Sequence, residues 1–175
     1  VQNWNWESPY AGTYIKWSHS FKAFLDSALF CFMQEGSGIG TSNYTDDLTG
    51  DDHIAAELYA CVTGKEFTPE DEDNFGWRIY LLERSILMRQ GLTRADDELF
   101  DEVYEEYATE NVDKSIYQMD TGLTRERFDG MLERFYDAMG MDHETGYPCR
   151  STYEQLGITE IADRLEEECG LNLPA

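Results

Sequence analysis

The residues with the clearest chemical potential are an aspartate and a cysteine near the end of an apolar segment. Asp26 lies between Leu25 and Ala28, and Cys31 follows five residues after Asp26. A carboxylate buried in that setting without a partner would cost roughly several kcal/mol, so it needs hydrogen-bond donors, such as the amino groups of a cofactor. A thiolate beside it could ligate iron. The alternative interpretation is that Asp26 points to solvent and Cys31 fills the core as a small hydrophobe.

The other cysteines predict less. Cys61 and Cys169 lie close to apolar stripes and are expected to act as small hydrophobes, whereas Cys149 lies in a loop and has no assignable role. None of the four cysteines forms a C-x-x-C pair, and nothing indicates a secreted disulfide framework. A reducing, cytoplasmic setting therefore fits best.

Several common catalytic and metal-binding motifs are absent from the sequence. None of its three histidines belongs to H-E-x-x-H or follows a glutamate by three residues, and there is no phosphate-binding glycine motif. His143 and Cys149 share a loop, but two candidate ligands do not make a metal site. Glu83 and Arg84 lie on a largely apolar helix and could be buried partners, but a surface or interhelical salt bridge is the favoured interpretation. No catalytic residue is assigned.

Helical periodicity dominates the first half of the chain. An apolar stripe predicts a helix over about 14–32, and the glycine-rich stretch 35–51 predicts a loop. A second helix from Ile54 is ended by Gly64. Thr68 then caps a long helix with Pro69 in its first position, and this helix runs to about Arg89 and is stopped by Gly91. Its apolar residues on one face are Phe75, Ile79, Leu82 and Ile86. Thr93 is expected to cap a fourth helix to about 107.

The second half follows a polar stretch at 108–122. Thr124 caps the next helix, in which Leu123 and Phe128 have the spacing of a hydrophobic staple. After a loop at 140–149, a capping box beginning at Ser151 and a cap at Thr159 predict two more helices. No convincing period-2 strand appears. The fold class is therefore all-α, an irregular bundle of about six or seven helices, with residues 1–175 as a single helical domain.

The charge balance excludes several kinds of partner. There are 36 acidic and 13 basic residues, which give a net charge of −23. Such a field repels nucleic acid and anionic lipid, so neither is an expected partner. No apolar run is long enough to span a membrane, and no secretory signal is visible. Because the first residue is Val1 rather than Met, the chain is compatible with a start inside a longer protein.

Three ordered segments resemble one enzyme family. Residues 17–32 (WSHSFKAFLDSALFCF) resemble the stretch that carries the second pterin-binding motif, Asp-x-x-Gly-Leu-Cys, of aldehyde:ferredoxin oxidoreductases. Residues 67–97 are similar to that family's Thr-Pro-Glu, Leu-Glu-Arg and Arg-x-Gly-x-Thr-Arg-x-Asp-Asp sequence, and residues 131–157 to its Asp-x-x-Thr-Gly-x-Pro segment. The order and spacing agree over nearly the whole chain, as expected for the C-terminal part of such an enzyme.

The resemblance implies a tungstopterin or molybdopterin enzyme with a [4Fe-4S] cluster, which oxidises aldehydes to carboxylic acids, or the reverse, with ferredoxin as electron acceptor. By motif position, Asp26 would hydrogen-bond a pterin, and Cys31 would be the fourth cluster ligand. The family's other three cluster cysteines, its first pterin motif and its proposed catalytic residues lie in N-terminal domains that are absent from this sequence. The chain alone is therefore expected to be inactive and to bind no cofactor. Its expected partners are those domains, ferredoxin or a similar redox protein, and a second copy associating through an exposed apolar face.

The sequence departs from the pterin motif at two positions. The motif's glycine is Leu29 here, and its leucine is Phe30. Five helical residues turn the chain by about 500°, so Asp26 and Cys31 on one regular helix would point roughly 140° apart. Either the backbone breaks between them without glycine, or one of the two contacts is lost. The alternative function is a non-catalytic helical domain of a divergent relative that has lost the cofactor.

Overall fold

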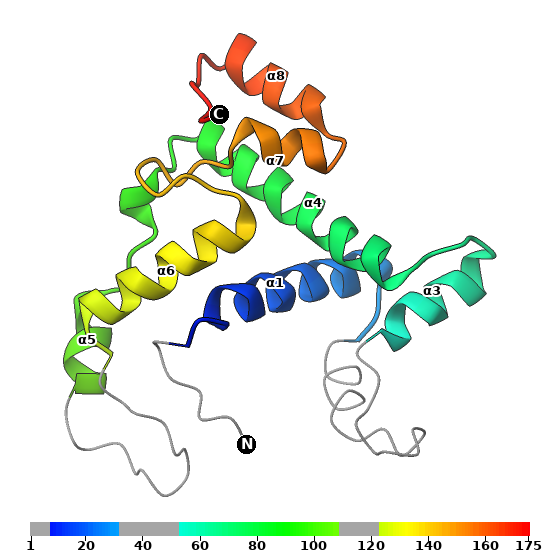
Figure 1. Cartoon of the computed structure of the whole chain (residues 1–175), viewed down its shortest axis with the longest axis horizontal. Helices are drawn as coiled ribbons and strands as arrows, with labels where there is room; N and C mark the ends of the chain where they lie inside the picture. The colour runs from blue at the N-terminus through cyan, green and yellow to red at the C-terminus, as the bar shows by residue number, and fades with distance from the viewer. Residues whose placement is uncertain (1–7, 32–52, 109–122) are drawn as a thin grey trace, which may run out of the picture. The chain divides into compact units, whose positions relative to one another are not determined.

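The computed structural model describes residues 8–31, 53–108 and 123–175, which are mostly helical (Figure 1). The seven α-helices of this part are α1 (Ala11–Ala28), α3 (Ile54–Thr63), α4 (Pro69–Arg89), α5 (Asp101–Ala108), α6 (Arg125–Met139), α7 (Arg150–Gln155) and α8 (Thr159–Glu167), and a 3-10 turn spans Arg94–Asp96. In these ranges the one extended pairing is an isolated bridge between Met141 and Pro148. The predicted all-α fold is confirmed. The predicted loop at 35–51 and nearly all of the polar stretch at 108–122 lie outside the described residues.

The chain divides into two compact units. Residues 17–83 form one, here named the central unit, and residues 1–16 with 84–175 form the other, the terminal unit. The divisions fall inside helices, so α1 and α4 each supply residues to both units. The expectation that residues 1–175 form a single domain stays a prediction.

The central unit is built on an aromatic core. Phe21, Phe24 and Leu25 of α1 are buried with Ala55 of α3, and partly buried aromatic and apolar residues pack around them: Trp17, Ala28, Phe30, Tyr59, Phe67 and Phe75. The Phe24 ring stacks on Phe67 with centroids 5.5 Å apart and meets Phe75 edge-on at 5.8 Å. The apolar stripe predicted for this helix therefore faces the core, as its spacing of three and four requires.

Helix ends in the central unit follow the predicted signals. Gly64 adopts a φ of 66° directly after α3, and its N–H donates to the carbonyl of Ala60. Thr68 and Asp71 form a reciprocal cap, in which the Asp71 N–H donates to Thr68 Oγ1 (3.2 Å) and the Thr68 N–H to Asp71 Oδ2 (2.8 Å). Pro69 then opens α4. These predictions are confirmed because each depends only on neighbouring residues.

The apolar face predicted for α4 is wrong in part. Leu82 and Ile86 remain 44% and 46% exposed, whereas the buried residues of this helix include Trp77, Leu81 and Met88. Apolar residues occupy more than one face of α4, so periodicity alone could not select the inward one.

The terminal unit has its own small core around α5 and α6. Tyr104, Leu123 and Phe128 are buried together, so the predicted staple partners share one cluster. The Arg127 N–H donates to Thr124 Oγ1 (3.2 Å), which confirms the predicted cap of α6. In this unit Gly12 of α1 approaches α6 so closely that an added Cβ would lie 2.0 Å from the Arg134 carbonyl oxygen.

Three predicted helix starts are wrong. Thr93 caps only the 3-10 turn, and α5 begins later, at Asp101. Helix α7 begins after Cys149, so Ser151 already lies inside the helix and does not cap it. Thr159, predicted as a cap, is already the first residue of α8.

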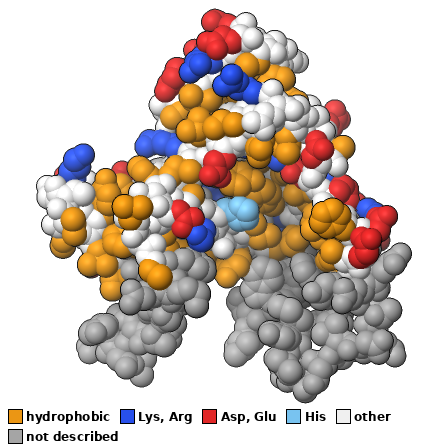
Figure 2. Space-filling view, turned by 180° about the vertical axis from the view of Figure 1, so that it is seen from behind, with side chains coloured by type: hydrophobic (Ala, Val, Ile, Leu, Met, Phe, Trp, Pro, Cys, Tyr) orange, Lys and Arg blue, Asp and Glu red, His pale blue; other side chains and the backbone are white. Residues whose placement is uncertain are grey.

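No helix among the described residues is long and apolar enough to cross a membrane. Hydrophobic side chains nevertheless reach the surface at many points between acidic ones (Figure 2). The most exposed of the large ones are Leu29, Val62, Phe100 and Tyr10, at 91%, 83%, 83% and 70%.

Candidate functional site

The end of α1 breaks the helix between the two residues singled out by the sequence. Leu29 has a φ of 63°, in the left-handed region that favours glycine. The Phe30 N–H donates to the Leu25 carbonyl at 2.9 Å, the six-to-one bond of a Schellman ending. A non-glycine residue pays about 1–2 kcal/mol for that conformation. The backbone therefore breaks without glycine, one of the two outcomes that the sequence left open.

The break leaves both candidate residues accessible. The Asp26 side chain is 61% exposed and forms an ion pair with Lys22, one turn earlier on α1. Cys31 is exposed, so it does not fill the core, whereas the intervening Phe30 packs against the aromatic core of the central unit. Asp26 thus points to solvent, as the alternative interpretation held, but Cys31 does not follow that interpretation.

The remaining candidate ligands do not gather in the described part of the chain. There, no group of three or more histidine, cysteine, aspartate or glutamate residues could hold a metal ion. His143 Nε2 lies 2.8 Å from Asp137 Oδ1. Cys61 is exposed, so its predicted role as a small hydrophobe is wrong, whereas Cys169 and Cys149 are half-buried.

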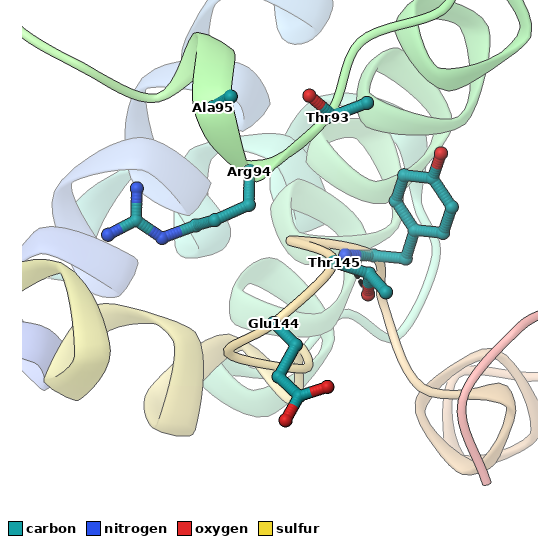
Figure 3. Close-up of a pocket in the computed structure, with 6 residues that line it drawn as sticks. Thr93, Arg94, Ala95, Glu144 and Thr145 are labelled. Carbon is teal, nitrogen blue, oxygen red and sulfur yellow. Dashed lines mark hydrogen bonds between the residues drawn. The ribbon is translucent and has the colours of Figure 1, made fainter.

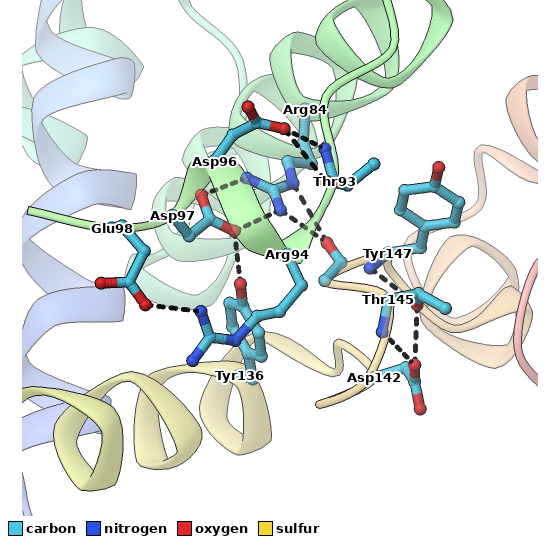
Figure 4. Close-up of polar contacts among 11 residues, drawn as sticks. Arg84, Thr93, Arg94, Asp96, Asp97, Glu98, Tyr136, Asp142, Thr145 and Tyr147 are labelled. Carbon is cyan, nitrogen blue, oxygen red and sulfur yellow. Dashed lines mark hydrogen bonds and ion pairs between the residues drawn. The ribbon is translucent and has the colours of Figure 1, made fainter. Parts of the chain in front are cut away.

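A buried arginine organises the terminal unit (Figure 4). Arg84, only 6% exposed, donates from Nη1 and Nη2 to the two carboxylate oxygens of Asp97 at 2.7 and 2.5 Å. Its Nε and Nη2 also donate to the Gly146 carbonyl at 3.1 and 2.8 Å. The predicted partner Glu83 is exposed instead. We name the set of Arg84, Asp97, Tyr136 and Gly146 the arginine clamp.

The clamp leaves no room for a side chain at Gly146. Its φ is 69°, and an added Cβ would lie 2.7 Å from Arg84 Nη2 and 3.0 Å from the Tyr136 hydroxyl. The same loop is held at Thr145, whose carbonyl accepts from the Arg94 N–H (2.9 Å) and whose N–H donates to Asp142 Oδ1 (2.8 Å). Two segments distant in sequence, 93–97 and 142–147, are therefore fixed to one another.

Tyr136 completes the clamp from α6 by donating its hydroxyl proton to Asp97. Burial is the main cause that raises the pKa of Tyr136, and the hydrogen bond to Asp97 and the charge of that carboxylate raise it further. Arg84 and Arg94 oppose the shift only in part. The neutral phenol is therefore favoured in the folded state.

Alkaline pH should weaken the clamp. Because the pKa of Tyr136 is higher in the folded than in the unfolded chain, its contribution is complete below pH ~10 and is lost as pH rises above that value. We expect the free energy of unfolding to fall more steeply between pH 9.5 and 11, values set by the ~10 of free tyrosine, in the wild type than in Tyr136→Phe. Tyr10→Phe, at a 70% exposed site, is the control and should follow the wild type. Identical pH profiles for all three proteins would refute this.

A shallow groove of about 440 Å³ lies beside the clamp, lined by Thr93, Arg94, Ala95, Glu144, Thr145 and Tyr147 (Figure 3). The Arg94 guanidinium points away from Tyr147 (Figure 4) and pairs with Asp129 at 3.3 Å. The Glu144 carboxylate points in a different direction from the Arg94 guanidinium (Figure 3). Since its charged side chains do not converge, the groove has no arrangement suited to acid–base or nucleophilic catalysis.

Sequence reasoning missed the clamp as a unit. Arg84 and Asp97 lie in segment 67–97 of the family resemblance, and Gly146 lies in segment 131–157. Sequence spacing can pair residues within one helix or turn, but it cannot pair residues from two distant segments. A signal existed in the apolar surroundings of Arg84, because a buried guanidinium needs a carboxylate partner.

Comparison with known proteins agrees with the three segments and their order. The family model described as aldehyde ferredoxin oxidoreductase, domains 2 and 3, matches residues 3–158. The match includes the end of α1, the arginine clamp and the loop that carries Gly146. No solved structure matches the chain. Because the family model covers well over half of its residues, the chain belongs to the aldehyde ferredoxin oxidoreductase family and corresponds to domains 2 and 3 of that enzyme.

Proposed function

We propose that this chain is the C-terminal part of an oxidoreductase that oxidises aldehydes to carboxylic acids, or runs in reverse, and passes electrons to ferredoxin or a similar redox protein. The family match over residues 3–158 carries this proposal. The enzyme would use a tungstopterin or molybdopterin and a [4Fe-4S] cluster, and the chain alone would be inactive.

The residues at the end of α1 have the chemistry that these groups need. Cys31 offers an exposed thiol, the group that becomes a thiolate ligand of iron. Asp26 offers an exposed carboxylate, which can accept hydrogen bonds from a pterin's amino groups. The left-handed turn at Leu29 ends the regular helix that would hold the two side chains roughly 140° apart, so the backbone is compatible with both contacts.

This chain would bind and orient the cofactors, whereas other domains would supply most of the ligands. When bound, the metal–pterin centre supplies two-electron chemistry, and the cluster supplies one-electron transfer. Asp26 would exchange its ion pair with Lys22 for the pterin, and Cys31 would complete the cluster's ligands. The remaining three cluster ligands would come from the N-terminal domains, and no residue of this chain is assigned a proton-transfer role.

A matched pair of cysteine variants tests the assignment in the full-length protein purified without oxygen. Cys31→Ser should abolish the cluster's visible absorption and its signal in electron paramagnetic resonance, because serine is a poor iron ligand. Cys61→Ser, at another exposed cysteine of the central unit, should leave both signals unchanged. A full complement of iron in the Cys31→Ser protein would refute the role of Cys31.

The second candidate is a non-catalytic helical domain that kept the fold and lost the cofactor. It is favoured by Leu29 and Phe30 in place of the motif's residues and by the ion pair that already occupies Asp26. Metal analysis separates the two functions. Stoichiometric tungsten or molybdenum with four iron atoms, the content of one [4Fe-4S] cluster, would support the enzyme, whereas none of these metals would support the second candidate.

A further inference from the structure

Leu29 combines two features that are each unfavourable for a leucine. Its backbone is left-handed, with a φ of 63°, although glycine adopts that conformation at a lower free-energy cost. Its side chain is 91% exposed and so gains almost nothing from burial. Within the described residues, burial of the isobutyl group therefore does not offset the free-energy cost of the left-handed backbone.

The left-handed turn at the end of α1 leaves Leu29 exposed near Cys31. Phe30 is drawn inward, since its ring packs against the aromatic core and its N–H is bonded to the Leu25 carbonyl. The residues on either side of Phe30, Leu29 and Cys31, are both exposed. The Phe30 anchor thus leaves a bulky apolar group and a thiol at the surface, separated by a single residue.

We propose that Leu29 shields a cluster bound at Cys31 from water and thereby lowers its reduction potential. This inference rests on the proposed function, because it requires the cluster. Exposure to solvent is one of the properties that set the potential of such a cluster. One-electron reduction adds a negative charge, which water stabilises, so a group that excludes water disfavours the reduced state.

Two substitutions separate shielding from backbone strain. Leu29→Ala removes the bulk but keeps a side chain in the left-handed conformation, whereas Leu29→Gly removes both. Val62→Ala, at an 83% exposed apolar residue of α3, is the matched control. The experiment uses the full-length protein with its cluster and follows the cluster's visible absorption during a redox titration. A second measurement follows the rate at which an iron chelator bleaches that absorption.

Both Leu29 variants should show a more positive midpoint potential and several-fold faster bleaching, while Val62→Ala behaves as the wild type. Unchanged potential and bleaching rate in Leu29→Ala would overturn the shielding role and leave the proposed function intact. An effect in Leu29→Gly alone would assign the change to the backbone and would also overturn it. Absence of the cluster from the wild-type full-length protein would refute both this inference and the proposed function.

Discussion

Alanine in place of Gly76 should destabilise the central unit by about 3 kcal/mol or more, because the new methyl group has no space. An added Cβ would lie 1.9 Å from the carbonyl oxygen of Ser20 and 2.5 Å from its carbonyl carbon. Both atoms belong to the backbone of α1, so no side-chain rotation can relieve the clash. Helix α4, which carries Gly76, would have to move away from α1, and the aromatic core beside Phe21 and Phe24 would open.

The control for this substitution is Gly130→Ala in α6. There an added Cβ would meet only the end of the flexible Arg134 side chain, at 3.5 Å. Alanine should therefore stabilise that helix by about 0.5–1 kcal/mol, the ordinary difference in helix propensity. Urea unfolding monitored by circular dichroism measures both variants. Equal effects of the two substitutions would show that the approach of α1 and α4 at Gly76 is not a tight one.

Loss of the Arg84 side chain should cost the terminal unit about 3–5 kcal/mol, the usual effect of removing one member of a buried ion pair. In Arg84→Met the Asp97 carboxylate loses both guanidinium bonds, and the Gly146 carbonyl loses its side-chain donors. Arg84→Lys should fall between this variant and the wild type, since an ammonium keeps the charge but cannot reproduce the planar, forked contacts.

Arg164→Met provides the comparison. This arginine is 62% exposed and pairs with Glu168 one turn later on its own helix, so its loss should cost only about 0.3–0.5 kcal/mol. Urea unfolding gives both values. An effect below about 1 kcal/mol for Arg84→Met would mean that the clamp is not a major source of stability.

Local signals in the sequence were sufficient for the boundaries of α3 and α4 and for the start of α6. The ends of α3 and α4 depend on Gly64 and on the Thr68–Asp71 cap, whose partners lie within three or four residues. Predictions of helix starts failed in segments that form hydrogen bonds with residues distant in sequence. The Asp97 carboxylate pairs with Arg84 directly after the 3-10 turn, and the N–H of Arg150, the first residue of α7, donates to the distant Pro174 carbonyl at 2.8 Å.

Close helix approaches gave no such signal. Gly12 and Gly76 carry the tightest of them, yet an isolated glycine in a helical pattern predicts only a weaker helix. The contacts that explain both glycines join residues far apart in sequence, and composition cannot reveal them.

The sequence names the residues of the candidate site, which remain a prediction, but it does not give their geometry. The motif pointed to Asp26 and Cys31, and helix geometry required a break between them. Whether Leu29 would permit that break depends on the inward packing of Phe30, which stabilises the left-handed residue before it. That packing is a tertiary contact with residues distant in sequence, so the local sequence pattern does not reveal it.

The division of α1 between the two units has a consequence for the order in which the protein can assemble during synthesis. The central unit ends at Glu83, so all of its residues are available while the later part of the chain is still being made. Gly12, in contrast, must wait for Arg134 before its close contact can form. On a ribosome the first turns of α1 would therefore lack this contact until Arg134 has emerged. A pause before residue 134 would leave the central unit complete and the terminal unit without its α6 partner, a state in which premature association or proteolysis would begin at the first turns of α1.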